Sequence, residues 1–152
     1  MLKKVISGGQ CGADRLGLEI AKELGIETGG TAPKSYRTEI GNDYTLKDFG
    51  LTEDSSVNYN PRTEKNVIDS DGTLLLGDME SPGSRKTIEY LSKHKKKYIT
   101  NPTVDEIYDF IKTNNIKTLN VAGNRASKLT MGKMYEIIQL LREGFKKCIN
   151  DN

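Results

Sequence analysis

Three short segments of the chain combine glycine with polar side chains that could bind an anion. They are 7–12 (Ser-Gly-Gly-Gln-Cys-Gly), 77–84, and 122–125 (Ala-Gly-Asn-Arg), and each follows an apolar run. Glycine lets main-chain N–H groups approach a ligand closely, and a helix that begins just afterwards presents unpaired N–H donors and a partial positive charge. The first segment lacks the dinucleotide-binding G-x-G-x-x-G spacing and the Walker A lysine. A purely structural turn is therefore the alternative to an anion site.

Arginine is used selectively in this lysine-rich chain, which has 17 lysines and 6 arginines. Five of the arginines lie in or beside the glycine segments or in a long polar stretch: Arg15, Arg37, Arg62, Arg85 and Arg125. A planar guanidinium grips phosphate or carboxylate with two parallel hydrogen bonds, which a lysine cannot do. The pattern indicates a site for an anionic, phosphorylated small molecule. In the alternative interpretation these arginines pair with carboxylates, namely those of Asp14, Glu39, Asp69 and Asp71.

Several other side chains have both a functional and a structural interpretation. Asp14 falls in the first turn of a predicted helix, where a carboxylate also offsets the helix dipole. The run 69–72 (Asp-Ser-Asp-Gly) could bond a ribose or pterin or hold Mg²⁺, or could form a turn. Cys11, at a predicted helix N-terminus, is either a reactive or metal-binding thiolate or a small residue in a tight loop. Three tyrosines of the polar stretch could stack on a heteroaromatic ring or pack the loop: Tyr36, Tyr44 and Tyr59.

Composition narrows the class of protein. The chain of 152 residues has a net charge of +2, which gives no global field toward nucleic acid or an anionic membrane, and its length predicts one domain over 1–152. No apolar run reaches the length of a membrane span or a signal peptide, so we expect a cytoplasmic protein. Two cysteines at opposite ends and a single histidine, His94, predict neither a metal site nor a Ser-His-Asp triad. We therefore predict no catalytic residue set.

Hydrophobic periodicity predicts alternating strands and helices. Strands are expected over 3–7, 26–32, 72–77, 98–100 and 118–123, and helices over 13–24, from 83 to the basic run 93–97, over 103–111 and over 134–145. The stretch 33–61 shows little periodicity and is predicted to be a long loop. Such alternation is typical of an α/β, Rossmann-like three-layer fold with a doubly wound, mostly parallel sheet and helices on both faces. The three glycine segments would then share one sheet edge, where ligands bind in such folds.

With these segments in view, the sequence resembles the molybdenum-cofactor carrier proteins, the family named "putative molybdenum carrier". The family lies in the Rossmann-like superfamily that includes the "lonely guy" phosphoribohydrolases. The resemblance rests on the stretches 7–15, 28–30 with 33–34, 62–64 with 66–67, 69–73 and 119–123. They run in the family's order from residue 5 to residue 141, nearly the whole chain.

The resemblance implies a pocket for the pterin and phosphate of molybdenum cofactor, with Mg²⁺ or another ion accompanying the phosphate, in a homodimer or homotetramer. By position it implies a first binding loop of Gly8, Gly9, Gln10, Gly12, Asp14 and Arg15, a second of Thr63, Asn66, Asp69, Ser70 and Asp71, and a last of Gly123 and Arg125. The predicted cofactor-binding set is completed by Cys11, Lys34, Arg62, Gly83, Ser84 and Asn124. The chain departs from the family where Cys11 replaces a threonine and where 82–84 read Pro-Gly-Ser.

Three functional hypotheses follow. The first is a binding or carrier protein for an anionic, ring-containing phosphate ligand, with molybdenum cofactor as the named candidate. The second is hydrolysis of a nucleoside phosphate, as in the "lonely guy" relatives. Their motif P-G-G-x-G-T-x-x-E ends in a glutamate, and Glu89 lies one residue earlier than that position. It would therefore point about 100° away from the required helix face. The third is a sensor that sequesters a nucleotide-like signal. The first and third need the same anion pocket.

Overall fold

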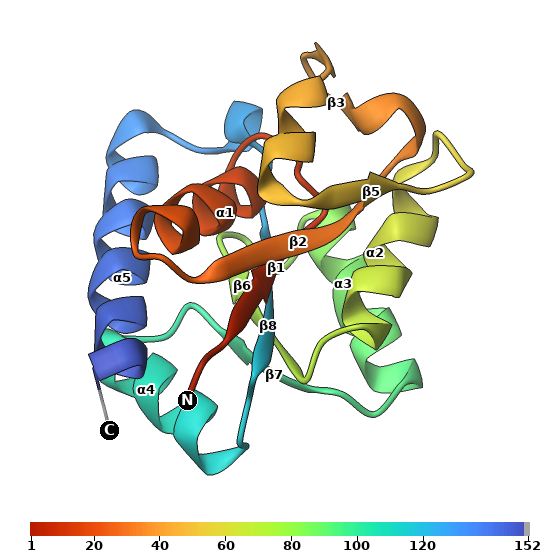
Figure 1. Ribbon diagram of the computed structural model, residues 1–152. Coiled ribbons are helices and arrows are strands. Elements are labelled where there is room, and N and C mark those ends of the chain that lie inside the picture. Colours follow the sequence, from red (N-terminus) through yellow and green to blue (C-terminus); the bar gives the residue numbers. More distant parts are fainter. Residues whose placement is uncertain (151–152) are drawn as a thin grey trace.

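The protein is built on one six-stranded parallel sheet (Figure 1). We describe residues 1–150 of the computed structural model. In spatial order the strands are β5 (Leu51–Glu53), β2 (Glu27–Ala32), β1 (Lys4–Ile6), β8 (Thr118–Gly123), β6 (Gly72–Leu76) and β7 (Lys97–Thr100). Every neighbouring pair is parallel. The predicted α/β, Rossmann-like architecture is confirmed.

Helices cover both faces of this sheet. One face carries α1 (Ala13–Glu23), α4 (Val104–Thr113) and α5 (Met131–Asn150), and the other carries α2 (Tyr59–Ile68) and α3 (Pro82–Lys93) (Figure 1). The inner strand β6, between β8 and β7, is buried at all five positions, which explains its continuous apolar sequence. Among the described helices, none has the length and apolarity needed to cross a membrane.

Local sequence signals fix where the helices begin. The Thr103 hydroxyl and the Glu106 carboxylate form a reciprocal capping box at the start of α4. At the start of α3, the Ser81 side chain caps the helix and Pro82 occupies its first position, where the missing N–H costs nothing. These two helix starts agree with the sequence pattern to within one residue.

The prediction of one long loop over 33–61 is wrong. This stretch contains η1 (Lys34–Tyr36), the β3 (Arg37–Thr38) and β4 (Gly41–Asn42) hairpin, η2 (Tyr44–Phe49), β5 and the first turn of α2. Its few apolar side chains are spaced irregularly, yet Leu46, Phe49 and Leu51 form a separate core cluster with Leu18 of α1. Pro61 reads as a helix breaker, but a proline is tolerated in the first turn of a helix.

The three glycine segments do meet at one edge of the sheet. They follow β1, β8 and β6, which are adjacent and parallel, so their carboxyl ends lie side by side. The run 69–71 comes directly before β6 and therefore lies at the opposite, amino edge.

Candidate functional site

A cleft opens at the carboxyl edge, beyond the ends of β1, β8 and β6. Its walls come from the loop after β1, the start of α3, the exit of β8 and one face of α2. The cleft is lined by Gly8, Gln10, Asp14, Tyr59, Asn60, Arg62, Thr63, Asn66, Ser81, Pro82, Gly83, Lys86, Thr87, Asn120, Ala122, Gly123, Asn124, Arg125 and Lys128. Polar and charged side chains therefore dominate this hollow.

Arg62 is the most deeply placed cation of the cleft, with a side chain that is 12% exposed. One guanidinium nitrogen, Nη1, donates to Thr63 Oγ1 at 2.8 Å and lies 3.9 Å from Asp14 Oδ2. The Nε nitrogen of the same guanidinium is buried and has no hydrogen-bond partner within the described residues. Burial lowers the pKa of Arg62, while the Asp14 carboxylate opposes that shift. A guanidinium nevertheless remains charged in proteins.

The position of the Arg62 side chain leaves no room for a side chain at Gly8. A Cβ added at Gly8 would lie 2.6 Å from Arg62 Nη1 and 2.8 Å from its Cζ, because the guanidinium lies directly over this position. A side chain at Gly8 would push the arginine out of its place.

Asp14 is a buried carboxyl group that also lines the cleft. Burial raises its pKa from 3.8 to about 6, because the charged form loses solvation. The Arg62 guanidinium opposes this shift, as do the main-chain N–H groups of Gln10, Gly123 and Gly8. The carboxyl is therefore predominantly ionised at neutral pH, at a cost in folding free energy.

The start of α3 is held at the cleft by Asn124. The Asn124 Oδ1 atom accepts the Asp78 N–H at 2.5 Å, and its Nδ2 donates to Ser81 Oγ at 2.9 Å. Ser81 Oγ in turn accepts the Ser84 N–H as the N-cap. The exit of β8 thus positions the N-terminus of α3, where Gly83 presents no side chain to the cleft.

The face of α2 that carries Arg62 is tied to the sheet by Asn66. The Asn66 side chain accepts the Thr31 N–H and donates to the Thr31 carbonyl, both at 2.9 Å. Deeper in the cleft, the Asn120 amide donates to Thr73 Oγ1 at 3.2 Å. These bonds fix the polar walls without using the Arg62 guanidinium.

A hairpin closes one side of the site through Glu39, at the tip between β3 and β4. The Glu39 carboxylate accepts the Ser127 N–H at 2.9 Å and the Ser127 hydroxyl at 2.6 Å, and lies 3.9 Å from Arg125 Nε. The Gln10 side-chain oxygen accepts the Glu39 N–H at 2.9 Å. The hairpin, the loop after β1 and the loop after β8 are therefore joined.

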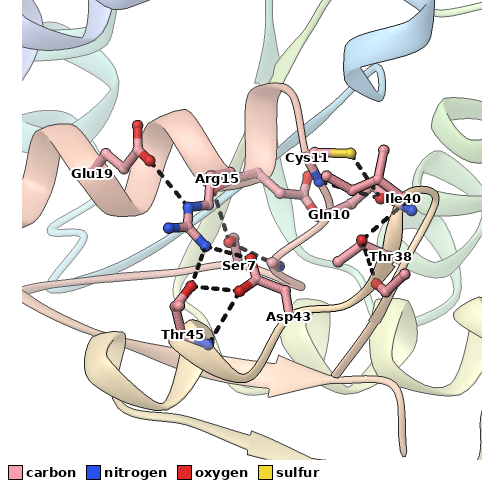
Figure 2. Close-up of polar contacts among 12 residues, drawn as sticks. Ser7, Gln10, Cys11, Arg15, Glu19, Thr38, Ile40, Asp43 and Thr45 are labelled. Carbon is pink, nitrogen blue, oxygen red and sulfur yellow. Dashed lines mark hydrogen bonds and ion pairs between the residues drawn. The ribbon is translucent and has the colours of Figure 1, made fainter. Parts of the chain in front are cut away.

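Cys11 belongs to this junction and does not line the cleft. Its thiol donates to the Glu39 carboxylate at 3.3 Å and to the Gln10 side-chain oxygen at 3.4 Å. Figure 2 shows the sulfur of Cys11 with the neighbouring Gln10. Burial and the Glu39 carboxylate raise the pKa of the thiol. A helix-terminal thiolate is thus not favoured here, and the structural interpretation of Cys11 fits better.

Arg15 was expected in the first binding loop, but it points away from the cleft. Its guanidinium pairs with Asp43 at 2.5 Å and with Glu19 at 3.0 Å and lies over the Phe49 ring, which anchors the segment 43–49 to α1 (Figure 2). The neighbouring Gly9 and Gly12 are also absent from the lining. Gly9 has a φ of 77° and faces Leu46 and Leu51, so it serves packing.

Other predicted site residues also lie outside the cleft. Gly12 has a φ of 113° and lies against the main chain of 124–126, where any side chain would clash. Lys34 begins η1, and its N–H donates to the Ser56 carbonyl. Ser84 is buried on the sheet side of α3, with a hydroxyl that has no partner within the described residues.

The run 69–71 lies at the amino edge of the sheet, away from the cleft. Asp69 pairs with Lys65, and the Ser70 hydroxyl donates to the Val67 carbonyl. Asp71 Oδ2 accepts the N–H groups of Lys117 and Thr118, each at 2.9 Å. These residues close a turn, as the structural interpretation proposed.

Of the five selected arginines, only Arg62 and Arg125 line the cleft. Both also face the carboxylates that the alternative interpretation named, Asp14 and Glu39, each at 3.9 Å. Arg37 lies over the Tyr59 ring and Arg85 pairs with Glu80 on the surface. Arg62 and Arg125 thus lie near carboxylates and also line the cleft, and the expected convergence of five arginines is wrong.

The prediction included the strand exits but missed several lining residues of the helices. They are Asn60, Lys86, Thr87 and Lys128, together with Asn120 of β8. Lys86 and Thr87 follow Gly83 by three and four positions, so they share its helix face, a signal that was available in the sequence. Tyr59, one of three tyrosines considered for stacking, lines the cleft, whereas Tyr36 and Tyr44 pack against each other.

Comparison with known proteins agrees with this architecture. A model of the circularly permutated YpsA SLOG family matches residues 5–142. The crystal structure of a protein named "putative molybdenum carrier protein" from Syntrophus aciditrophicus SB is 33% identical, with a TM-score of 0.79, over 97% of this chain and 95% of that one. No curated protein matches the chain.

Two other solved structures match at lower similarity. AtPrR2 in apo form is 16% identical over 82% of this chain and 49% of that one, with a TM-score of 0.46. (E)-4-Hydroxy-3-methyl-but-2-enyl diphosphate reductase is 12% identical over 92% and 58%, with a TM-score of 0.40. Because the family model spans nearly the whole chain, the protein belongs to the circularly permutated YpsA SLOG family.

Proposed function

We propose that the protein binds a small phosphorylated molecule with a planar ring in the cleft at the carboxyl edge. The observation that carries this proposal is the group of cations that line the cleft, with the nearly buried Arg62 at its inner end. Arg125, Lys86 and Lys128 add positive charge to the same walls.

The phosphate is placed best at the start of α3. There Ser81, Pro82 and Gly83 line the cleft at the positive end of the helix dipole, and Lys86 lies one turn further on. The loop after β1 is a poorer place for the phosphate, because its main-chain N–H groups already face the Asp14 carboxylate. This placement is more specific than the sequence-based expectation, which put the pterin and the phosphate at the glycine segments together.

Molybdenum cofactor is the named candidate ligand. It combines a phosphate with a pterin ring, and the structural neighbour from Syntrophus aciditrophicus carries the name of a molybdenum carrier. The Tyr59 ring lines the cleft and can contact a planar heterocycle. A carrier that delivers this ligand and a sensor that withholds a nucleotide-like signal would use the same cleft.

Hydrolysis of a nucleoside phosphate has less support. Glu89, the glutamate that the sequence comparison offered for this reaction, is exposed, lies 3.4 Å from Lys86 and does not line the cleft. Asp14 is the cleft's only carboxylate within the described residues. Incubation with nucleoside monophosphates, with release of free base as the readout, tests this alternative.

The proposed function is tested by calorimetric titration with molybdenum cofactor and with nucleoside monophosphates. We expect Arg125→Ala to weaken the binding of whichever ligand binds by about tenfold, the value of one charged hydrogen bond. Arg85→Ala is the matched control, because Arg85 pairs with Glu80 outside the cleft. Equal affinity of wild type and Arg125→Ala for every ligand would refute the proposed site, and mass spectrometry of co-purified molecules would identify the natural ligand.

A further inference from the structure

The charged groups of the cleft are separated by depth. Asp14 and Arg62 form its buried part, with side chains 6% and 12% exposed, whereas the Arg125 side chain is 46% exposed and the Lys86 side chain 34%. A phosphate is attracted by the exposed cations and repelled by the Asp14 carboxylate. A ligand that fills the cleft therefore presents its phosphate to the outer cations and a different chemical group to Asp14.

The protein keeps Asp14 charged in spite of its burial. Arg62 compensates the charge from 3.9 Å, which is too long for a hydrogen bond, so the guanidinium does not use the accepting capacity of the carboxylate. Main-chain N–H groups of the loops stabilise it from the protein side. An ionised carboxylate only accepts hydrogen bonds, and in a dry site it strongly prefers N–H or O–H donors over acceptors.

The ring of the ligand is the part that can reach this carboxylate. Tyr59 lines the same cleft as Asp14, and the Arg37 and Arg62 guanidinium groups lie over its ring. The ring edges of common heterocycles differ in what they offer a carboxylate. A 2-amino-4-oxopyrimidine edge, shared by guanine and pterins, has two adjacent N–H donors, hypoxanthine has one, and the adenine edge pairs one donor with one acceptor.

We propose that Asp14 is the specificity-determining residue of the cleft and that it accepts the paired N–H groups of a 2-amino-4-oxopyrimidine ring. This inference rests on the proposed function, since it assumes that the phosphate of the same ligand lies at the outer cations. It extends that function by naming the class of ring. Guanine nucleotides and phosphorylated pterins belong to the class, and adenine nucleotides do not.

The test compares GMP with IMP, which differ only in the 2-amino group. Wild-type protein binds GMP at least about tenfold more tightly than IMP, because a site built for a donor discriminates strongly against the analogue that lacks it. In Asp14→Asn this preference disappears, since the amide offers one acceptor in place of two. The Kd for ribose 5-phosphate, which has no ring edge, stays the same or improves because a repulsive charge is removed.

Controls separate a loss of specificity from a loss of fold or of phosphate binding. Asp69→Asn, at the opposite edge of the sheet, keeps the preference for GMP. Thermal unfolding shows whether Asp14→Asn is folded, and the GMP and IMP affinities of the wild type test the inference even if it is not.

Two results would overturn the inference while leaving the proposed function intact. One is equal wild-type affinity for GMP, IMP and ribose 5-phosphate, and the other is equal affinity for GMP and IMP with weaker binding of 2′-deoxyguanosine monophosphate, which would assign Asp14 to the ribose. Absence of binding for all these phosphates, and for a phosphorylated pterin, would overturn both.

Discussion

Two aspartates at opposite edges of the sheet show how differently the same side chain is used in this protein. Asp71, at the amino edge, accepts two main-chain N–H groups at 2.9 Å and ties the start of β6 to the start of β8. Asp14, at the carboxyl edge, is buried beside a cleft, has its nearest cation at 3.9 Å and has a raised pKa. Main-chain N–H groups stabilise both carboxylates, but the first is exposed, whereas the second is buried and carries its charge at a cost in folding free energy.

The same contrast holds for the surroundings of each aspartate. At the amino edge, Lys65 pairs with Asp69, and Lys96 donates to the Ile68 and Ser70 carbonyls. At the carboxyl edge, Arg62 leaves Nε unpaired, and a Cβ at Gly83 would meet no atom within 4 Å. The carboxyl edge therefore holds a buried hydrogen-bond donor without a partner in the described chain, next to a cleft.

The largest effect is expected from removal of the Arg62 charge. Arg62→Met keeps the length of the side chain but removes the buried cation, so we expect the affinity for GMP or molybdenum cofactor to fall by about 100-fold or more. The variant also leaves Asp14 without its counterion, which raises the pKa of that carboxyl further. Titration calorimetry measures the affinity, and Arg85→Met, on the surface, should leave it unchanged. Retained affinity in Arg62→Met would remove the main support for the proposed site.

The next largest effect concerns stability and pH. The pKa of Asp14 is raised by folding from 3.8 to about 6, so the folded state binds this proton more tightly than the unfolded state does. Between these two values the free energy of unfolding therefore falls as pH rises, by about 3 kcal/mol in total. Asp14→Asn cannot ionise, so it should gain about that amount relative to wild type between about pH 4 and about pH 7.5.

Urea unfolding of both proteins at the two pH values measures this difference. The comparable Asp71→Asn variant should show no such gain, because its carboxylate is exposed and hydrogen-bonded by the fold. A pH-independent difference between wild type and Asp14→Asn would show that Asp14 is not destabilised by its charge.

A smaller and opposite effect is expected at the amino edge. Asp71→Ala removes the acceptor for the Lys117 and Thr118 N–H groups, which are exposed enough to bond water instead. We expect a loss of about 1 kcal/mol in the free energy of unfolding and no change in the Kd for any cleft ligand. Chemical unfolding and calorimetry on the same samples separate the two quantities. Weaker ligand binding in Asp71→Ala would restore the run 69–71 as part of the site.

Much of the fold could be predicted from the sequence, because its signals are local. The apolar run 72–76, the capping box at Thr103 and the glycine exits each carry their own evidence, and they are placed correctly. The segment 33–58 could not be predicted in this way. Its structure depends on the packing of Leu46, Phe49 and Leu51 against Leu18. These residues are distant in the sequence, and hydrophobic periodicity does not predict contacts of this kind.

The site was predicted in outline but not in detail, for a related reason. The sequence places Asp14 and Asp71 beside glycines in much the same manner, and only the sheet topology assigns them to opposite edges. Likewise, Arg15 and Arg62 look equivalent in the sequence. Arg15 turns toward Asp43 because η2 lies beside α1, an arrangement that depends on the unpredicted segment.

The smallest effect, and the sharpest test of the unfilled space, is expected at Gly83. Gly83 and Gly132 both occupy the second position of a helix, have no positive φ and have no atom closer than 4.0 Å to an added Cβ. Alanine at either position should therefore raise the free energy of unfolding by about 0.5–1 kcal/mol. Only at Gly83 would the new methyl group enter the cleft, where it should weaken GMP binding by about fivefold through loss of close approach at the start of α3. Chemical unfolding measures the stability of the two variants, and calorimetry measures their Kd for GMP. A Kd that is equal in Gly83→Ala and Gly132→Ala would mean that the phosphate binds elsewhere.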